Sequence, residues 1–317
     1  MNEQILLEKL RKLESKYEAS GQNLESYLDG LYEADFLNYW DYIHIDTLLS
    51  LQTKRTTLPD EEIFIIYHQV TELYFRLILV ELEQICKSPE MEIHFLETRL
   101  SRVNRYFDIL VHSFTVMSEG MDAAQFMKFR MALLPASGFQ SVQYRLIELS
   151  CTSVDNLLDQ GHRSRIAGGS IEEKMPFLYW RSGSTDAVSG KKTLTLTRFE
   201  EKYDITLLDF ANRHKDLNLY DRFRDLDWNL DVNQPIRLLL RQLDNNANIA
   251  WRMAHLHSAS KYLKKPDSAV NATGGTDWQR YLPPRFQKLV FFPFLWSPEE
   301  LANWGKPGEF NSTVKPF

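Results

Sequence analysis

The chain has 317 residues, 44% of them hydrophobic, which is enough for one large domain or two small ones. Its formal net charge of −6, with no segment that concentrates basic residues, argues against a nucleic-acid partner. The two cysteines, Cys86 and Cys151, are too few for a disulfide framework and fit a reducing compartment. The charged N-terminus does not resemble a signal peptide, and the apolar run 77–82 is too short to span a bilayer. We therefore expect a soluble, cytoplasmic protein with no membrane partner.

The first predicted helix covers residues 3–18, where apolar residues fall on one side of the helix. Such a terminal helix packs either on its own domain or on a neighbouring subunit, and the pattern leaves both alternatives open. We interpret residues 1–36 as an N-terminal helical arm of a single domain over 1–317. Residues 37–49, which follow the arm, are dense in aromatic side chains.

The strongest helical pattern is Phe64–Ile85. Pro59 and a run of carboxylates precede it, as is favoured at a helix N-terminus. Apolar residues recur here at three- and four-residue spacing, which predicts a helix buried in the core: Ile63, Ile66, Val70, Leu73, Leu77 and Leu82. His68, Glu72 and Arg76 interrupt this pattern on one stripe. Because a buried polar group without a partner costs about 1–3 kcal/mol, we expect these side chains to be satisfied by each other, by solvent or by a ligand.

Further helices are predicted over residues 91–118, 122–134, about 140–158, from about 205, and from Pro235 to about Leu263. Residues 160–195 are rich in glycine and serine, so we expect a variable region of surface loops there, with 191–197 as a candidate short strand. Almost every strong signal is helical. The sequence therefore predicts an all-α fold, a bundle of long packed helices.

The eight histidines form no zinc-binding motif. His255 and His257 lie two residues apart near the end of the last long helix, so they cannot both bind one metal ion from a regular helix. A lone histidine there is by default a hydrogen-bonded structural residue, although a single imidazole projecting from a helix also suits haem iron. His68 has the same two interpretations, as part of a polar core network or as a side chain that faces a pocket.

Arg130 lies among aromatic residues in the segment QFMKFRMALL. A solvated helix arginine gives this pattern, but an arginine in aromatic surroundings also suits bidentate binding of a carboxylate. Residues 272–276, ATGGT, fit either a flexible turn or a segment whose glycines let the backbone approach a ligand.

Four blocks of the sequence together resemble the tryptophan 2,3-dioxygenase family. They are NYWDYIHIDTLLS at 38–50, FIIYHQVTELYFRLILVELEQI at 64–85, FRMALLPASGFQSVQYRLIEL at 129–149, and WRMAHLHSASKYL followed by ATGGTDW. The third block is similar to the long family pattern F-R-x-x-L-x-P-x-S-G-F-Q-S-x-Q-Y-R and is the most specific of the four. Their order and spacing agree with the family from about residue 37 to 296.

The resemblance implies roles for three residues at the reaction centre. His255 falls where the pattern W-R-x-x-H has the proximal ligand of haem b, and His257 becomes a bystander on the adjacent face. His68 becomes the distal histidine that accepts a hydrogen bond from the indole N–H. Arg130 becomes the clamp on the substrate carboxylate.

Other implied contacts surround the substrate. Phe64 becomes a wall of the pocket, and Thr273 supplies a hydroxyl to the amino-acid end of the substrate. Tyr39 and Tyr42 complete the pocket of a neighbouring subunit, since the family is a tetramer that shares this segment between protomers. The resemblance thus implies a homotetramer.

The reaction that the resemblance implies is a step of tryptophan catabolism in the kynurenine pathway. Both atoms of O2 enter across the C2–C3 bond of the indole of L-tryptophan, and the ring opens to N-formylkynurenine. Haem with one histidine ligand leaves the sixth position for dioxygen. An arginine and apolar aromatic walls suit a substrate that presents a carboxylate and a flat ring.

The sequence also departs from the family pattern. Phe126 stands where the family typically has a tyrosine whose hydroxyl supports the substrate carboxylate, Trp40 and Asp41 replace small residues, and Thr276-Asp277-Trp278 replaces S-S-G. These changes leave alternatives open. One is a related haem-dependent hydroxylase of tyrosine-like amino acids, another is a non-catalytic haem or amino-acid sensor, and the last is a helical interaction protein without haem.

Overall fold

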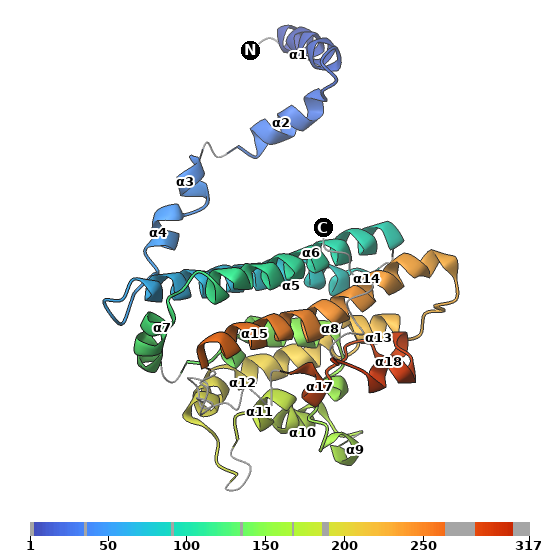
Figure 1. Ribbon diagram of the computed structural model, residues 1–317. Helices are drawn as coiled ribbons and strands as arrows, with labels where there is room; N and C mark the ends of the chain where they lie inside the picture. Colours follow the sequence, from blue (N-terminus) through green and yellow to red (C-terminus); the bar gives the residue numbers. More distant parts are fainter. Residues whose placement is uncertain are drawn as a thin grey trace. The chain divides into compact units, whose positions relative to one another are not determined.

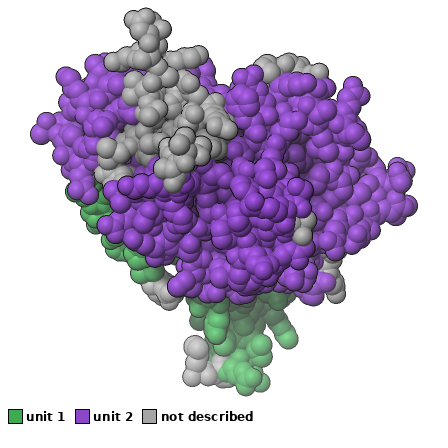
Figure 2. All heavy atoms as spheres, turned by 90° about the horizontal axis from the view of Figure 1, so that it is seen from below, with its two compact units in different colours: residues 1–53 green, residues 54–317 purple. Residues whose placement is uncertain are grey.

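The computed structural model describes residues 3–34, 37–89, 92–133, 136–166, 168–185, 190–263 and 283–306. These residues are mostly helical and, apart from two isolated β-bridges, contain no strand. The prediction of an all-α fold is confirmed. The chain divides into two compact units, residues 1–53 and residues 54–317 (Figure 1; Figure 2). The single domain over 1–317 with an arm at 1–36 stays a prediction.

The unit of residues 1–53 consists of helices that share no core of their own. Its helices are α1 (Glu3–Glu18), α2 (Leu24–Tyr32), α3 (Tyr39–Tyr42) and α4 (Ile45–Leu49). The prediction of a helix over 3–18 is confirmed by α1. None of the four helices contains a buried residue, so burial of apolar side chains within this unit does little to stabilise it.

The unit of residues 54–317 is built on long helices that pack side by side. The longer helices are α5 (Asp60–Lys87), α6 (Ile93–Ser118), α7 (Ala123–Phe129), α8 (Val142–Cys151), α12 (Leu194–His214), α14 (Gln234–Asn245) and α15 (Trp251–Leu263). The shorter ones are α9 (Arg163–Ile166), α10 (Ile171–Lys174), α11 (Tyr179–Ser182), α13 (Leu219–Phe223), α17 (Pro284–Gln287) and α18 (Pro298–Ala302). Helix α5 packs on α6 and α8, and α6 packs on α14 and α15 (Figure 1).

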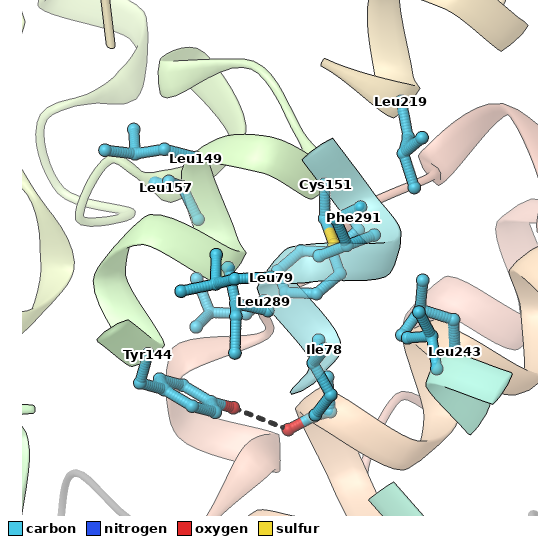
Figure 3. Close-up of a cluster of buried hydrophobic side chains, with 14 of the residues drawn as sticks. Ile78, Leu79, Tyr144, Leu149, Cys151, Leu157, Leu219, Leu243, Leu289 and Phe291 are labelled. Carbon is cyan, nitrogen blue, oxygen red and sulfur yellow. Dashed lines mark hydrogen bonds between the residues drawn. The ribbon is translucent and has the colours of Figure 1, made fainter. Parts of the chain in front are cut away.

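Helix α5 buries one face and exposes an apolar stripe on another. Ile78 and Leu79 belong to the main hydrophobic cluster, part of which Figure 3 shows. The predicted helix is confirmed, but the expectation of burial is wrong for four of its apolar residues, which are exposed: Ile66, Val70, Leu73 and Leu77. Because apolar residues occur all round α5, periodicity alone could not identify the buried face.

The composition of α5 has a second consequence. Among the described residues, α5 is the one helix long and apolar enough to cross a membrane, with a mean hydropathy of 1.4 in its most apolar window. This property rests on length and composition only, and the core helix of a water-soluble protein has it as well.

The predicted helix over about 140–158 is interrupted. Helix α8 ends at Cys151, and the hydroxyl of Thr152 donates a 2.7 Å hydrogen bond to the carbonyl oxygen of Phe291. Ser153 then caps a separate 3-10 turn, Val154–Leu157. The break therefore depends on a contact with a segment 139 residues away, which local sequence does not reveal.

Residues 160–195 differ from the expected surface loops. Their described part contains the short helices α9, α10 and α11, and both Leu178 and Trp180 are buried. The candidate strand at 191–197 is wrong, because α12 begins at Leu194. The side chain of Thr193 caps this helix by accepting a hydrogen bond from the N–H of Leu196 at 3.2 Å.

The helix predicted from Pro235 to Leu263 is nearly continuous, but a π-helical turn, Asn246–Ala250, separates α14 from α15. The hydroxyl of Tyr144 on α8 donates a 3.0 Å hydrogen bond to the carbonyl oxygen of Ala247 within this turn, drawn as a dashed line in Figure 3. The wider turn is therefore held in place from a neighbouring helix.

Asp244, at the end of α14, ties this helix to the C-terminal segment. Its fully buried carboxylate accepts hydrogen bonds from the backbone N–H groups of Phe291 at 2.8 Å and Phe292 at 3.1 Å. The side chains of Asn248 and Trp296 donate to the same carboxylate at 2.8 and 3.0 Å. These bonds fix the helix that leads to His255.

Candidate functional site

His68 projects from the first half of α5. Its Nδ1 lies 2.7 Å from the carbonyl oxygen of Phe64, and because a carbonyl oxygen only accepts, Nδ1 carries the proton. Burial lowers the pKa of His68. The side chain is thus a neutral imidazole whose Nε2 is a hydrogen-bond acceptor.

His68 lies at the edge of the packed core. Its side chain is accessible to solvent, while its ring lies 4.1 Å from that of Phe64 and 5.6 Å, edge-on, from that of Tyr67. His68 is therefore open to a ligand at this edge.

The other two members of the predicted polar stripe have separate partners. Glu72 accepts a 2.9 Å hydrogen bond from the side-chain amide of Gln143. Arg76 is exposed and lies 4.0 Å from Glu83. The stripe is therefore not one network, and His68 is its only member that lies in the aromatic cluster described next.

Aromatic rings line the space beside His68. The ring of Phe64 lies 4.1 Å from the imidazole, measured between ring centroids, and 6.2 and 5.8 Å from the rings of Phe126 and Phe129. The ring of Tyr262 packs on Phe126 at 4.9 Å. Helices α5, α7 and α15 together build a wall of aromatic rings, and such a wall suits contact with a flat ring.

Arg130 follows Phe129 directly and begins the 3-10 turn Arg130–Leu133. Its side chain is only 3% exposed, and burial lowers the pKa of its guanidinium. A guanidinium keeps its charge even so, and a charge in such a place is stabilised by an anion. The structure therefore brings a buried cation next to the aromatic wall around Phe64.

His255 lies on α15 against Phe114 of α6, with the two rings stacked at 5.8 Å. Burial lowers the pKa of His255 to about 4, with smaller contributions from the neighbouring His68 and Arg252. The imidazole is therefore neutral near pH 7, and neither of its nitrogens has a hydrogen bond to a residue that the structure describes. The ring of Tyr67 lies 5.6 Å from that of His68 and 5.8 Å from that of Phe114, so both histidines border one aromatic cluster.

Gly138 leaves an edge of His255 open. A methyl group at position 138 would lie 3.4 Å from Cε1 and 3.9 Å from Nε2 of His255. An alanine here would thus touch the imidazole at ordinary van der Waals distance, and a larger side chain would compete for the space beside it. A neutral imidazole with free nitrogens and an open edge fits the axial ligand of a haem, which needs one histidine from the protein.

The structure does not test three of the predicted site residues. Thr273 lies outside the described residues. Tyr39 and Tyr42 lie on α3 in the other unit and are 71% and 73% exposed, so their contact with a substrate stays a prediction. His257 is exposed, as expected of a bystander.

Sequence reasoning missed several residues that contact the site or its helix. Phe114 and Gly138 approach His255 only because α6 and the segment before α8 meet α15, and no local pattern indicates this. A buried polar cluster also escaped notice. A three-residue spacing of Arg145 and Glu148 on one apolar helix was the available signal for it.

The polar cluster joins α8, α11 and α15. Nη1 of Arg145 lies 2.9 Å from Oε2 of Glu148 and donates a 2.7 Å hydrogen bond to the hydroxyl of Tyr179. That hydroxyl donates to Oε1 of Glu148. The guanidinium of Arg252 lies 5.7 Å from the centre of the Tyr179 ring. The four side chains are buried and hold one another in place.

Comparison with known proteins points to one family. The sequence profile described as tryptophan 2,3-dioxygenase matches residues 30–158. A tryptophan 2,3-dioxygenase from Ruegeria sp. (strain TM1040) is 31% identical over 270 residues, which cover 83% of this chain and 92% of that protein. One from Polaromonas naphthalenivorans (strain CJ2) is 27% identical over 264 residues, 82% of this chain and 90% of its own length. One from Xenopus tropicalis is 36% identical over a shorter stretch of 148 residues, 42% of this chain and 36% of that protein.

Proposed function

The chain belongs to the tryptophan 2,3-dioxygenase family, and from this premise we propose that it inserts both atoms of O2 across the indole C2–C3 bond of L-tryptophan. The product is N-formylkynurenine. The observation that carries the proposal is the pair of imidazoles, His68 and His255, which border one aromatic cluster through Tyr67 and Phe114. Such a site suits an oxidoreductase that handles a flat aromatic substrate.

His255 would hold haem b. Its neutral imidazole and the open edge beside Gly138 support this role. Haem b, when bound, supplies the dioxygen chemistry. The protein supplies binding, orientation and exclusion of water.

Arg130 would bind the carboxylate of the substrate. Each charge-assisted hydrogen bond from a buried guanidinium contributes about 1.5–3 kcal/mol. Phe64 and Phe126 would cover the indole, and the absence of a hydroxyl on Phe126 leaves the carboxylate to Arg130 and to Thr273. Tyr39 and Tyr42 of a neighbouring copy would complete the pocket.

His68 would orient the indole. Its Nδ1 is occupied by the carbonyl of Phe64, so Nε2 is left to accept a hydrogen bond from the indole N–H. An indole N–H is a very weak acid, and an imidazole with a lowered pKa is a weak base. His68 therefore positions the ring more than it removes a proton.

The protein would act as a cytoplasmic homotetramer. The apolar stripe on α5 supports this: Ile66, Val70, Leu73, Leu77 and Val80 are exposed in the single chain and recur at alternating four- and three-residue spacing. That spacing is typical of a seam against another helix. A neighbouring copy of the chain would cover it, and would also cover the apolar residues of α1 to α4.

The assembly has a direct test. Leu73→Glu with Leu77→Glu should reduce the mass measured by light scattering below that of a tetramer. Ile205→Glu, at a 79% exposed position on α12, is the matched control and should leave the tetramer intact. A wild-type monomer at micromolar concentration, or a chain that sediments with membranes, would contradict this assembly.

The function is tested by the mass of the product. Haem-loaded protein is reduced without oxygen, and L-tryptophan and ¹⁸O2 are then added. A product that carries two labelled oxygen atoms supports the dioxygenase. One labelled atom, or turnover of L-tyrosine only, would indicate the related hydroxylase, and bound haem with no product from either amino acid would indicate a sensor. Failure of the chain to bind haem would leave a helical interaction protein.

A further inference from the structure

A tyrosine near the end of α15 supports one ring of the aromatic wall beside His68. The ring of Tyr262 packs on that of Phe126 at 4.9 Å, measured between ring centroids, with the two planes tilted by 49°. Phe126 in turn lies 6.2 Å from Phe64 and 5.5 Å, edge-on, from Phe129. Phe126 therefore links Tyr262 to the ring of Phe64, which contacts the imidazole of His68.

The hydroxyl of Tyr262 fixes the position of its ring. It donates a hydrogen bond to the carbonyl oxygen of Met117, in the last turn of α6, and lies 3.3 Å from the carbonyl oxygen of Met121, just before α7. Tyr262 is buried, as are both methionines. A buried ring that is held at its hydroxyl and packed on Phe126 has little room to move.

The backbone of α7, which carries Phe126, is held from α5. The side chain of Asp122 caps α7 by accepting a 2.8 Å hydrogen bond from the N–H of Gln125, and the N–H of Asp122 donates to Oδ2 of Asp60 at 2.6 Å. The N–H of Asp60 donates to the side-chain oxygen of Gln125 at 3.3 Å. The place of the Phe126 ring therefore depends on its own side-chain torsions and on the rings that pack on it.

We propose that Tyr262 is a positioning residue that holds Phe126 in place and so limits the size of the flat ring that the site accepts. This inference rests on the proposed function and narrows its substrate class to L-tryptophan without substituents on the benzene ring. A closely packed wall does not yield to an added methyl group. Truncation of Tyr262 leaves a cavity beside Phe126, into which the wall can move.

The test compares L-tryptophan with the derivatives that carry one methyl group at each position of the benzene ring. Calorimetry measures their binding to the haem-loaded protein. The wild type should bind at least one derivative more weakly than L-tryptophan. In Tyr262→Ala the affinity for that derivative relative to L-tryptophan should rise about 10-fold or more, the scale of one methylene in an apolar pocket. Tyr262→Leu leaves a smaller cavity and should show a smaller rise.

Two control variants separate the ring from its hydrogen bonds and from stability. Tyr262→Phe loses the hydroxyl but keeps the ring, so it should retain the wild-type selectivity. Tyr220→Ala is the matched control, because Tyr220 packs on Phe294 at 5.5 Å with a tilt of 54°, and Phe294 packs on the main hydrophobic cluster. Its loss should lower the melting temperature and leave the selectivity unchanged. If Tyr262→Ala fails to fold by far-UV circular dichroism, Tyr262→Leu still tests the direction.

The outcomes separate this inference from the proposed function. If the haem-loaded wild type binds no L-tryptophan, the proposed function fails and this inference fails with it. If L-tryptophan binds but the truncations at Tyr262 leave the relative affinity for every derivative unchanged, the role of Tyr262 is overturned. It is also overturned if the wild type binds every derivative as tightly as L-tryptophan, or if Tyr262→Phe or Tyr220→Ala relaxes the selectivity as much as Tyr262→Ala does.

Discussion

The orienting role of His68 gives a quantitative prediction. Replacement by alanine removes one hydrogen bond between neutral partners, Nε2 of the imidazole and the N–H of the indole. Such a bond contributes about 0.5–1.5 kcal/mol, so kcat/KM for L-tryptophan should fall about 2- to 13-fold. Only one hydrogen bond is counted, because the 2.7 Å bond between Nδ1 and the carbonyl oxygen of Phe64 leaves Nε2 as the single unprotonated acceptor.

The assay compares two substrates with two enzymes. The substrate 1-methyl-L-tryptophan has no indole N–H, so His68→Ala should not slow its turnover further. The variant should even improve it, because the smaller side chain makes room for the methyl group. Haem content and substrate affinity, measured by absorption titration, confirm that the variant retains the site.

Two results would refute this reasoning. One is complete loss of activity in His68→Ala with haem and substrate still bound, which would require proton transfer by the imidazole. The other is an equal loss for both substrates, which would mean that His68 acts on something other than the indole N–H.

Three further predictions follow from the same geometry. Gly138→Val should abolish haem binding without changing the far-UV spectrum. Gly138→Ala, whose methyl group lies 3.4 Å from Cε1 of His255, should retain most of the haem binding. Soret absorbance after haem titration measures both variants, and tight haem binding by Gly138→Val would contradict the prediction. Arg130→Leu should weaken L-tryptophan binding about 10- to 150-fold for each charge-assisted hydrogen bond lost, but leave the binding of tryptamine, which has no carboxylate, unchanged in calorimetry. Burial raises the pKa of Asp244 from its ordinary 3.8 to about 6, so its contribution to the free energy of unfolding is present below pH 4 and is lost as the pH rises through 6. In urea unfolding from pH 4 to 7 the wild type should show this loss, about 3 kcal/mol, and Asp244→Asn should not; parallel pH profiles would exclude the assignment.

The sequence was sufficient for the helices that depend on local pattern. Helix α5 begins near Pro59 and its carboxylates, as expected, and α1 and α6 end close to their predicted limits. The sequence pattern did not predict features that depend on contacts between residues far apart in the chain. Thr152 ends α8 by bonding to Phe291, and the buried face of α5 is set by the helices that pack on it.

The candidate site divides in the same way. Phe64 and His68 lie one turn apart on α5, so their contact is implied by spacing, and Phe126 and Arg130 are likewise close in sequence. The approach of Gly138 to His255 depends on tertiary packing, and the tautomer of His68 depends on its hydrogen bond in the folded chain, so sequence pattern predicts neither. The contact between Arg252 and the ring of Tyr179 also depends on the packing of two separate helices, α15 and α11.

The π-helical turn at Asn246–Ala250 contains one residue more than a regular helical turn would need. One residue rotates everything after it by about 100° around the helix axis. The direction in which His255 points therefore depends on this one additional residue. A chain that lacked that residue would keep both helices and every side chain of α15, and would turn its imidazole away from His68.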